Sequence, residues 1–536
     1  MNSVSMDSAA AALISLRKKG VRIWSEKGQL HYRAPRGALT QEEIGELRAL
    51  KRQIVALLEK STEMTPVELG LETHPKLNRA PLTFSQLMHW HWKRLSERPT
   101  ARQVASAMRL RGRLNIETLQ RCVAVAVRRH DALRTRVVVL NGVPVQEISG
   151  PVEQVLKISD LSSLSVNNRE SEVQRLIEEQ ILQPIHVSVG PLFEARLLRL
   201  HEEEHVLVIT MEHIISDGVS HGILLSEIFA AYKQMAKGGA LSLPPIPFQF
   251  ANYAVWQRDF LKSWLERHGA YWGERVAGYK RLRFPDDQGA TFVTCPYWGV
   301  VQFQISRQLK AELREWSRLR KTTVVMSIFT VYVALVLRWC NASNAVIGYQ
   351  SDGRVSAEMQ HTIGYFSVTL YLQIELHRDD SFVDLMRRVA EEYLNMREHP
   401  TFSYLAAQMP LPEWTRSTVF NWVPQESTTA LFGMGDELVC SPVDLVRSLV
   451  ARVEGDGEPC IVLFDTEDGE TACEVWFPTD RFSKSTMERF GQHFLFFTRM
   501  LLDQPEGRVS DIQMQIQPSC SDGGFDSNHK LPVAVS

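Results

Sequence analysis

The chain has few cysteines and no cysteine motif that would hold a metal ion. Its seven cysteines, among 536 residues, are an odd and scattered set without a CxxC pair. This pattern argues against a disulfide framework and against a structural zinc site, and it is typical of a protein kept in a reducing compartment. We therefore expect a cytoplasmic location and no metal site.

Long apolar runs and an excess of charge of one sign are also missing. The first twenty residues lack an uninterrupted apolar core, so no signal peptide is expected, and no apolar run is long enough to cross a bilayer. The longest candidate, Val324–Leu337, is better interpreted as a buried helix. A net charge of −2 and a hydrophobic content of 44% are ordinary for a globular protein without membrane association.

One polar turn between two apolar segments stands out, Met211–Ser220, with the sequence MEHIISDGVS. The run before it, His205–Met211, is β-branched and apolar and predicts a buried strand. The run after it, Ser220–Lys233, has apolar residues at helical spacing, with Ser220 as the expected N-cap. His213 therefore follows the end of a strand on a loop held by a rigid frame, where catalytic groups are often placed.

Three interpretations of this turn remain open from its residues alone. In the first, His213 is a general base, because an imidazole titrates near neutral pH, and Asp217 holds the loop through a buried ion pair. In the second, Gly218–Gly222 is a G-x-S-x-G elbow and Ser220 is the nucleophile of a hydrolase. In the third, the polar residues only cap and cross-link a turn.

Companion motifs along the chain favour the first interpretation. The turn resembles the HHxxxDG motif of nonribosomal peptide synthetase condensation domains, a family of chloramphenicol-acetyltransferase-like acyltransferases. The companion segments, in the order of that family, are Leu82–Leu87 with Trp90, Arg129–Thr135, Phe248–Gln257, Thr322–Trp339, Ile347–Gly348 with Gly353–Arg354, and Ile363–Phe366. The second is close to RHExLRT and the third to YxDYAVWQ. Together they extend over roughly residues 80–515, and the order of the motifs makes the resemblance specific.

The chain departs from the family pattern at three motifs. Glu212 stands where the family has the first His of HHxxxDG, Val368 replaces the Asn of IGxFVNT, and Arg397–Ser403 is all that remains of HQDxPFE. The family assigns catalysis to the second His, which is His213 here. Glu212 is expected to modulate it, because an acidic neighbour favours the imidazolium form unless its side chain points away, as adjacent residues on an extended segment do.

The resemblance implies an α/β fold of two chloramphenicol-acetyltransferase-like lobes in a V shape, with a tunnel between them. It also implies that the donor is an acyl thioester presented on the phosphopantetheine arm of a partner carrier protein, so that the enzyme itself binds no cofactor. A thioester is already activated, and attack by an alcohol or amine needs mainly proximity and proton removal. One base then suffices, without a covalent intermediate on the enzyme.

The resemblance also gives expectations for residues around the base. Asp217 and Gly218 are expected to support the active-site loop, and Arg354 is the expected partner of Asp217, because a buried carboxylate requires a cation. Tyr253 and Trp256 are expected to pack in the core and between the lobes.

Residues 1–60 resemble the N-terminal β-hairpin docking domain of tubulysin-type synthetases. The pattern predicts a helix at Ala9–Lys19, hairpin arms at Val21–Ser25 and Gln29–Arg33 joined by the turn Glu26–Gly28, and a helix at Thr40–Lys60 that opens with a capping box. Eleven basic and six acidic residues give this segment a net charge of +5.

A basic hairpin with an open edge is suited to β-augmentation by a short acidic peptide. We expect this peptide to be the C-terminal tail of an upstream acyl or peptidyl carrier protein. The expected docking surface consists of Arg22, Trp24, Lys27 and Arg33. Nucleic acid is not an expected partner, because the segment has neither aromatic platforms nor a groove-reading helix.

The predicted segments are a docking domain at 1–60, a flexible linker at 61–80, an N-terminal lobe at 81–265, a C-terminal lobe at 266–515 and a disordered tail at 516–536. No adenylation or carrier domain follows residue 515, so we expect a freestanding, monomeric enzyme. It would transfer a polyketide or peptidyl chain to a carrier-bound or free small-molecule acceptor, forming an ester or amide and releasing the chain. Two rivals are a serine hydrolase or thioesterase that uses Ser220 and a non-catalytic recruitment domain, which Glu212 makes plausible.

Overall fold

The structure is a computed structural model, and it describes part of the chain. The described residues are 22–26, 29–33, 45, 48–51, 77–95, 103–150, 155–246, 248–259, 272, 275–287, 298–354, 357–398, 412–423, 438–443, 457–466 and 469–514. The helix predicted at Ala9–Lys19, the capping box of the next helix and the tail at 516–536 lie outside these residues. The chain forms two compact units, Met1–Leu71 with Ala311–Ile328, and Glu72–Lys310 with Phe329–Ser536.

The first unit contains the predicted hairpin. Strand β1 (Arg22–Glu26) pairs antiparallel with β2 (Gln29–Arg33), and Glu26 lies opposite Gln29. The hairpin is therefore confirmed, but Glu26 belongs to a strand and not to the turn, because the ladder continues to its last pair. Lys27 and the side chains of Arg22, Trp24 and Arg33 lie outside the described residues, and the docking surface stays a prediction.

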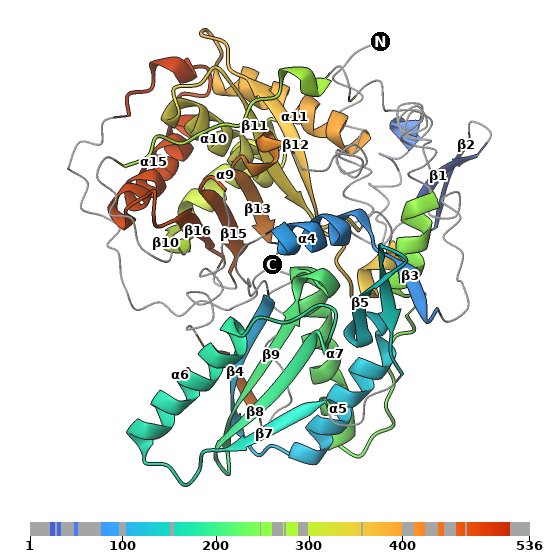
Figure 1. Cartoon of the computed structure of the whole chain (residues 1–536). Helices are drawn as coiled ribbons and strands as arrows, with labels where there is room; N and C mark the ends of the chain where they lie inside the picture. Colours follow the sequence, from blue (N-terminus) through green and yellow to red (C-terminus); the bar gives the residue numbers. More distant parts are fainter. Residues whose placement is uncertain are drawn as a thin grey trace. The chain divides into compact units, whose positions relative to one another are not determined.

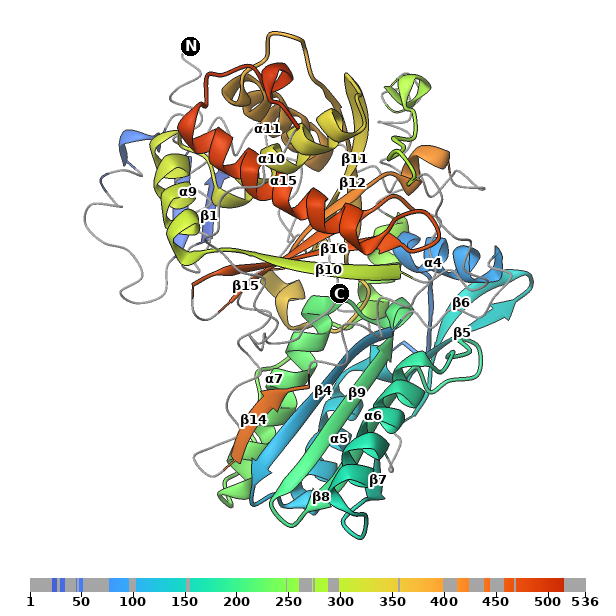
Figure 2. The ribbon, with the colours of Figure 1, turned by 90° about the vertical axis from the view of Figure 1, so that its left-hand side faces the viewer.

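The second unit contains a five-stranded sheet in the order β14-β4-β9-β8-β7. These strands are β14 (Leu438–Pro442), β4 (Gln103–Gly112), β9 (Glu204–Glu212), β8 (Phe193–His201) and β7 (Leu156–Asp160). Figure 2 shows β14, from the second half of the sequence, alongside β4 at the sheet edge. The halves predicted at 81–265 and 266–515 therefore both contribute strands to this sheet. Strand β14 covers an edge that β4 would otherwise leave open.

Helices cover both faces of this sheet (Figure 1): α5 (Ile116–Arg129), α6 (Val166–Leu182) and α7 (Gly218–Ala236). Ala105 and Ala107 of β4 share a buried cluster with Ile177 of α6. Ser106, between them, faces the other way and lies 2.8 Å from His221 Nε2 of α7. Because side chains alternate along a strand, α6 and α7 lie on opposite faces of the sheet, with β4 between them.

A six-stranded sheet in the order β10-β16-β15-β13-β11-β12 forms the other large core of this unit. Its strands are β10 (Trp298–Ile305), β16 (Thr471–Pro478), β15 (Cys460–Asp465), β13 (Val419–Val423), β11 (Asn344–Ser351) and β12 (Val368–Glu375). Helices α11 (Phe382–Glu398) and α15 (Lys484–Asp503) belong to this unit, as does α10 (Val324–Trp339) from Phe329 on, whereas most of α9 (Arg307–Leu319) belongs to the first unit. The ring centroids of Phe329 and Tyr332, both on α10, lie 5.0 and 5.7 Å from the ring centroid of Phe420 on β13.

The apolar segment Val324–Leu337 lies in α10, whose residues from Ile328 to Leu337 are fully buried, so the prediction of a buried helix is confirmed. Within the described residues, no single helix is long and apolar enough to span a membrane. Helices α9 and α10 reach that length and composition only as a pair, with a bend of 103° between them.

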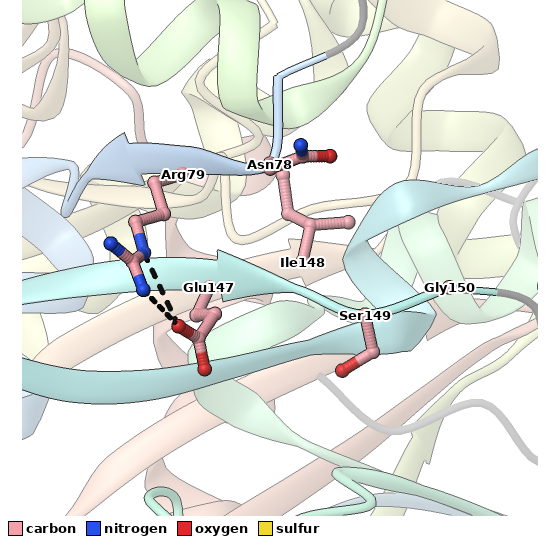
Figure 3. Close-up of a pocket in the computed structure, with 6 residues that line it drawn as sticks. All are labelled: Asn78, Arg79, Glu147, Ile148, Ser149 and Gly150. Atoms are coloured by element: carbon pink, nitrogen blue, oxygen red, sulfur yellow. Dashed lines mark hydrogen bonds and ion pairs between the residues drawn. The ribbon is translucent and has the colours of Figure 1, made fainter.

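A small three-stranded sheet has the order β3-β6-β5, with β3 (Arg79–Pro81), β6 (Val143–Ile148) and β5 (Thr135–Leu140), and α4 (Phe84–Leu95) follows β3. The linker predicted at 61–80 therefore ends too late, because Arg79 and Ala80 pair with β6. A pocket of about 660 Å³ lies here, lined by Asn78, Arg79 and Glu147–Gly150. Figure 3 shows these six residues. Arg79 and Glu147 form an ion pair at 2.8 Å beside it.

Several short segments complete the described structure. A further helix covers residues 250–259. The 3-10 helices are η1 (Asp131–Arg134), η2 (His213–Ile215), η3 (Val276–Gly278), η4 (Ala357–His361), η5 (Glu413–Arg416) and η6 (Val509–Asp511). The α/β fold class predicted from the sequence is confirmed.

Candidate functional site

The polar turn connects β9 to α7 as the sequence predicts. Strand β9 ends at Glu212, the single turn η2 covers His213–Ile215, and α7 begins at Gly218. The prediction that Ser220 is the N-cap of this helix is wrong. Asp217 has the extended backbone of a cap, and its Oδ1 accepts a hydrogen bond of 2.8 Å from Ser220 N. A carboxylate is favoured there because it accepts an otherwise unpaired N–H and faces the positive end of the helix dipole.

Asp217 is the centre of a buried polar cluster, and its expected partner Arg354 is present. Arg354 Nη1 donates to Asp217 Oδ2 at 3.0 Å, and Nη2 donates to Oδ1 at 3.1 Å. The backbone N–H groups of Phe366 and Ser367 also donate to Oδ2, at 3.0 and 3.2 Å. Burial alone would raise the pKa of Asp217, but Arg354 and the bond from Ser220 hold it below its usual value. The carboxylate therefore stays ionised and ties α7 to the loop that precedes β12.

Ser220 belongs to the same cluster and its hydroxyl is fully used. Its Oγ donates to Gly364 O at 2.8 Å and accepts from Gly364 N at 3.0 Å and from Arg354 Nη2 at 2.9 Å. One donor and two acceptor sites are all that a hydroxyl offers. The neighbouring imidazole, His221, bonds to Ser106 instead. Among the described residues, the Ser220 hydroxyl is therefore not bonded to an imidazole, the usual base of a nucleophilic serine.

Two glycines allow the loop to approach this cluster. Gly353 has φ +65°, and a Cβ there would lie 1.9 Å from Phe366 O. A Cβ on Gly364 would lie 2.0 Å from the Phe250 ring. Only glycine fits either position, since the first needs a left-handed backbone and both need close contact. The two residues therefore fix where Arg354 and Tyr365 lie.

His213 lies at the edge of this framework and is partly exposed. Its ring centroid is 4.8 Å from that of Tyr365, in an edge-on arrangement, and 6.1 Å from that of His89 on α4. Tyr365 itself is partly exposed, whereas His89 is buried. The imidazole of His213 is thus held between rings from two distant segments while part of it remains accessible.

Glu212, the neighbour of His213, points to α4. Its Oε1 lies 3.2 Å from His89 Nε2 and also accepts from Lys93 Nζ, while Oε2 accepts from Ile214 N at 2.5 Å. Burial would raise the pKa of this carboxyl group, but His89 and Lys93 outweigh that effect and lower the pKa to about 2. Glu212 is therefore ionised, and its carboxylate is paired with His89 and Lys93 of α4.

Helix α4 presents three polar residues to the turn: Gln86, His89 and Lys93. Besides the two contacts with Glu212, Gln86 Nε2 donates to Ile214 O at 2.9 Å. These three residues were not identified as a group from the sequence, and neither was Tyr365. Their spacing of three and four residues was the available signal, because residues with this spacing share one face of a helix.

The remaining motif segments are mainly structural. Tyr253 is 4% exposed, with its ring 4.8 Å from Phe366 and 5.5 Å from Trp256, so its expected packing role is confirmed. In Arg129–Thr135, His130 Nε2 lies 2.7 Å from Glu227 Oε2 of α7. These contacts position α5 and α7 without contributing a group to the turn.

Within the described residues, no group of three or more His, Cys, Asp and Glu side chains is placed to hold a metal ion. A partly exposed imidazole beside a rigid, ionised framework can accept a proton from an incoming alcohol or amine.

Comparisons with known proteins place this geometry in context. The sequence profile of the Condensation domain matches residues 76–518, and that of the TubC N-terminal docking domain matches residues 11–60. A linear gramicidin synthase protein from Brevibacillus parabrevis is 29% identical over 482 residues, which is 87% of this chain and 9% of that protein. The chain spans from 6% to 29% of the length of its first curated relatives.

Solved structures of several proteins share the fold. A chain from the complex of the X-domain and OxyB from teicoplanin biosynthesis has a TM-score of 0.70 and 21% identity, covering 83% of this chain and 98% of that chain. The SgcC5 protein from Streptomyces globisporus has a TM-score of 0.64 and 23% identity, covering 80% of this chain and 100% of that chain. At these identities the similarity establishes the fold alone.

Proposed function

The chain belongs to the condensation-domain family and carries a TubC-type docking domain, and we propose that it is an acyltransferase in natural-product biosynthesis. It would transfer a polyketide or peptidyl chain from a carrier-protein thioester to an alcohol or amine. The observation that carries the proposal is the placement of His213, partly exposed beside Tyr365 and fixed by the Asp217 and Arg354 cluster.

In the proposed reaction, His213 removes the proton of the acceptor hydroxyl or amine as its oxygen or nitrogen attacks the thioester carbonyl carbon. A carbon–oxygen or carbon–nitrogen bond forms and the carbon–sulfur bond breaks. The thiolate of the phosphopantetheine arm leaves and takes up the proton that His213 held. Because the thioester is already activated, a positioned base is sufficient and no enzyme-bound acyl group is needed.

The docking domain supports a partner in trans. We propose that residues 11–60 bind the short acidic C-terminal tail of an upstream carrier protein, because the segment 1–60 has a net charge of +5 and the β1-β2 hairpin is a two-stranded sheet. A strand from the partner can add to such a hairpin. The phosphopantetheine arm of the carrier would then present the acyl group, and the reaction would take place in the cytoplasm between a monomer and its carrier.

An alcohol is the first acceptor class to test, and its acylation would form an ester. The structure of SgcC5 was solved with a naphthyl 1,2-ethanediol, which is an alcohol. Transfer to a free alcohol would release the chain from its carrier. An amine acceptor would give an amide by the same proton transfer.

Intact-mass spectrometry of the carrier protein tests the proposal. An acyl carrier protein loaded with a thioester is incubated with the chain and a panel of alcohols and amines, with heat-denatured protein as control. The expected result is loss of the acyl mass from the carrier and appearance of an acylated small molecule with one acceptor class. Hydrolysis in every reaction, independent of the acceptor, would contradict acyl transfer and favour a thioesterase.

A non-catalytic recruitment domain is the second candidate. A structure with the same fold was solved as a complex with another protein, OxyB, and Glu212 replaces the first His of the motif. In that case the chain would bind the carrier protein and give no product with any acceptor. A binding measurement on the same samples therefore separates the two candidates.

A further inference from the structure

A buried charge cluster lies next to His213 and is not accounted for by the proposed reaction. It consists of Glu212 on β9 and of His89 and Lys93 on α4. The Glu212 side chain is 0% exposed, that of His89 is 1% exposed and that of Lys93 is 13% exposed. A buried carboxylate at this place needs an explanation, because burial of an ion is costly unless it is paired.

Lys93 provides the countercharge of this carboxylate. Its ammonium contacts Glu212 Oε1, the same oxygen that His89 Nε2 approaches at 3.2 Å, and it also donates to Ile185 O at 3.3 Å. The second oxygen of Glu212 is held by Ile214 N within η2. Lys93 is therefore fixed by two acceptors, and Glu212 cannot turn toward His213 without losing three partners.

The electrostatic surroundings of His213 depend on this pair. Among the described residues, the charged and titratable groups near the ring include Glu212 from β9, His89 and Lys93 from α4, Tyr365 from the loop before β12, and Asp217 with its partner Arg354. Arg354 already balances Asp217 through two hydrogen bonds. Among the described residues, the balance between Glu212 and its two α4 partners, Lys93 and His89, is then a further influence of charge on the His213 imidazole.

We propose that Lys93 is a positioning residue for His213: it neutralises Glu212 and holds it against α4, so that the imidazole stays in the basic form that proton removal requires. This inference rests on the proposed acyltransferase function. Without Lys93, an unbalanced carboxylate would favour the imidazolium form. Without Glu212, an unbalanced ammonium would favour the neutral form.

The test measures the titration of His213 directly. The full chain is labelled with [13Cε1]-histidine, and the His213 signal is assigned by its loss in His213→Gln. The midpoint of its titration is then compared between the unchanged chain, Lys93→Met, Glu212→Gln and the double variant. We expect Lys93→Met to raise the midpoint and Glu212→Gln to lower it, each by about one pH unit, the order of magnitude for one full charge about 10 Å from a titrating group at an effective dielectric constant near 20. The double variant is expected to return near the original midpoint.

Lys93→Arg is the matched control, because it keeps the charge and should keep the midpoint. If Lys93→Met does not fold, Glu212→Gln and Lys93→Arg still decide the question. An unmoved midpoint in Glu212→Gln, or shifts of the same sign in both single variants, would overturn the proposal and leave the cluster a purely structural one.

The pH dependence of acyl transfer from an acyl N-acetylcysteamine thioester gives the second readout. The acidic limb of kcat/KM should follow the midpoint in each variant. If the proposed acyltransferase function were wrong, the midpoint would still shift as expected, but neither the unchanged chain nor any variant would form product. The two failures are therefore distinguishable.

Discussion

Arg354 donates to both carboxylate oxygens of Asp217, and the two side chains are 0% and 2% exposed. The arginine follows β11 and the aspartate caps α7, so the pair joins segments that lie 137 residues apart in the chain. The guanidinium also lies over the Phe366 ring, 4.5 Å from its centroid. The loop carrying His213 is thus fixed by an ion pair that water does not reach.

Arg354→Met should destabilise the chain strongly. The substitution leaves a buried carboxylate without its cation, and breaking such a pair typically costs about 3–5 kcal/mol. Circular dichroism during thermal unfolding should show a markedly lower midpoint. The matched control is Asp217→Asn with Arg354→Met, which removes the unpaired charge and should recover part of the loss. Equal midpoints for the single and double variants would contradict the assignment of the effect to the buried charge.

Ser220→Ala should weaken the fold without removing a nucleophile. The change removes the acceptor of Gly364 N and one of the three acceptors of Arg354 Nη2, and a buried polar group left unpaired costs about 1–3 kcal/mol. A serine-directed fluorophosphonate should not label the unchanged chain, as read by intact mass. Covalent labelling at Ser220 would instead support the hydrolase interpretation.

The sequence predicted the turn and its main ion pair, because both depend on motif residues in a fixed order. His213, Asp217 and Gly218 are where β9 and α7 were expected to meet, and Arg354 reaches Asp217 as the resemblance implied. The cap was assigned to Ser220 because a serine before a helical pattern is a common N-cap. The aspartate three residues earlier fulfils that role, since its carboxylate reaches Ser220 N.

Features that depend on contacts between distant segments were not predicted. The α4 residues His89 and Lys93 lie beside the motif residues Leu82–Leu87 and Trp90, and nothing local connects them with Glu212, more than a hundred residues away. The pairing of β14 with β4 joins residues from opposite halves of the chain. A single sequence contains no signal for such pairings beyond a short apolar run.

His213→Ala should lower the rate of acyl transfer by roughly 10²-fold or more, the usual contribution of a positioned base. Carrier binding should not change, since the substituted ring lies in the turn and the docking domain is a separate segment. Single-turnover mass spectrometry and a titration of labelled carrier protein measure the two quantities. Full activity in this variant would remove His213 from the proposed mechanism.

Deleting residues 1–60 should raise the KM for carrier-bound donor and leave the reaction of a free thioester analogue unchanged. The expected docking is electrostatic, because the segment has a net charge of +5, and added salt should weaken it as exposed charges are screened beyond about 10 Å at 0.1 M. Kinetics with both donors at two salt concentrations test this. An equal loss with the free analogue would argue against a docking role.

Acid should destabilise the chain through His221 before it affects the buried carboxylates. His221 is completely buried on α7, with Nε2 2.8 Å from Ser106 Oγ, and burial lowers its pKa to about 4 from the ordinary 6.5. The folded chain therefore binds this proton less readily than the unfolded chain. The contribution to stability is complete above about pH 6.5 and is lost as the pH falls toward about 4. This difference between the ordinary and the folded-state pKa of His221 corresponds to about 3 kcal/mol of folding free energy.

His221→Gln separates this effect from the others, because glutamine can still form a hydrogen bond with Ser106 but does not titrate. Between about pH 6.5 and 4 the thermal midpoint of the unchanged chain should fall more steeply than that of the variant. His205, whose pKa burial also lowers, leaves a residual slope in both proteins. Glu212 acts in a lower window: its pKa is about 2 in the fold, so its contribution is lost only as the pH falls below about 4.5. Parallel curves for the two proteins would show that another group controls the loss in acid.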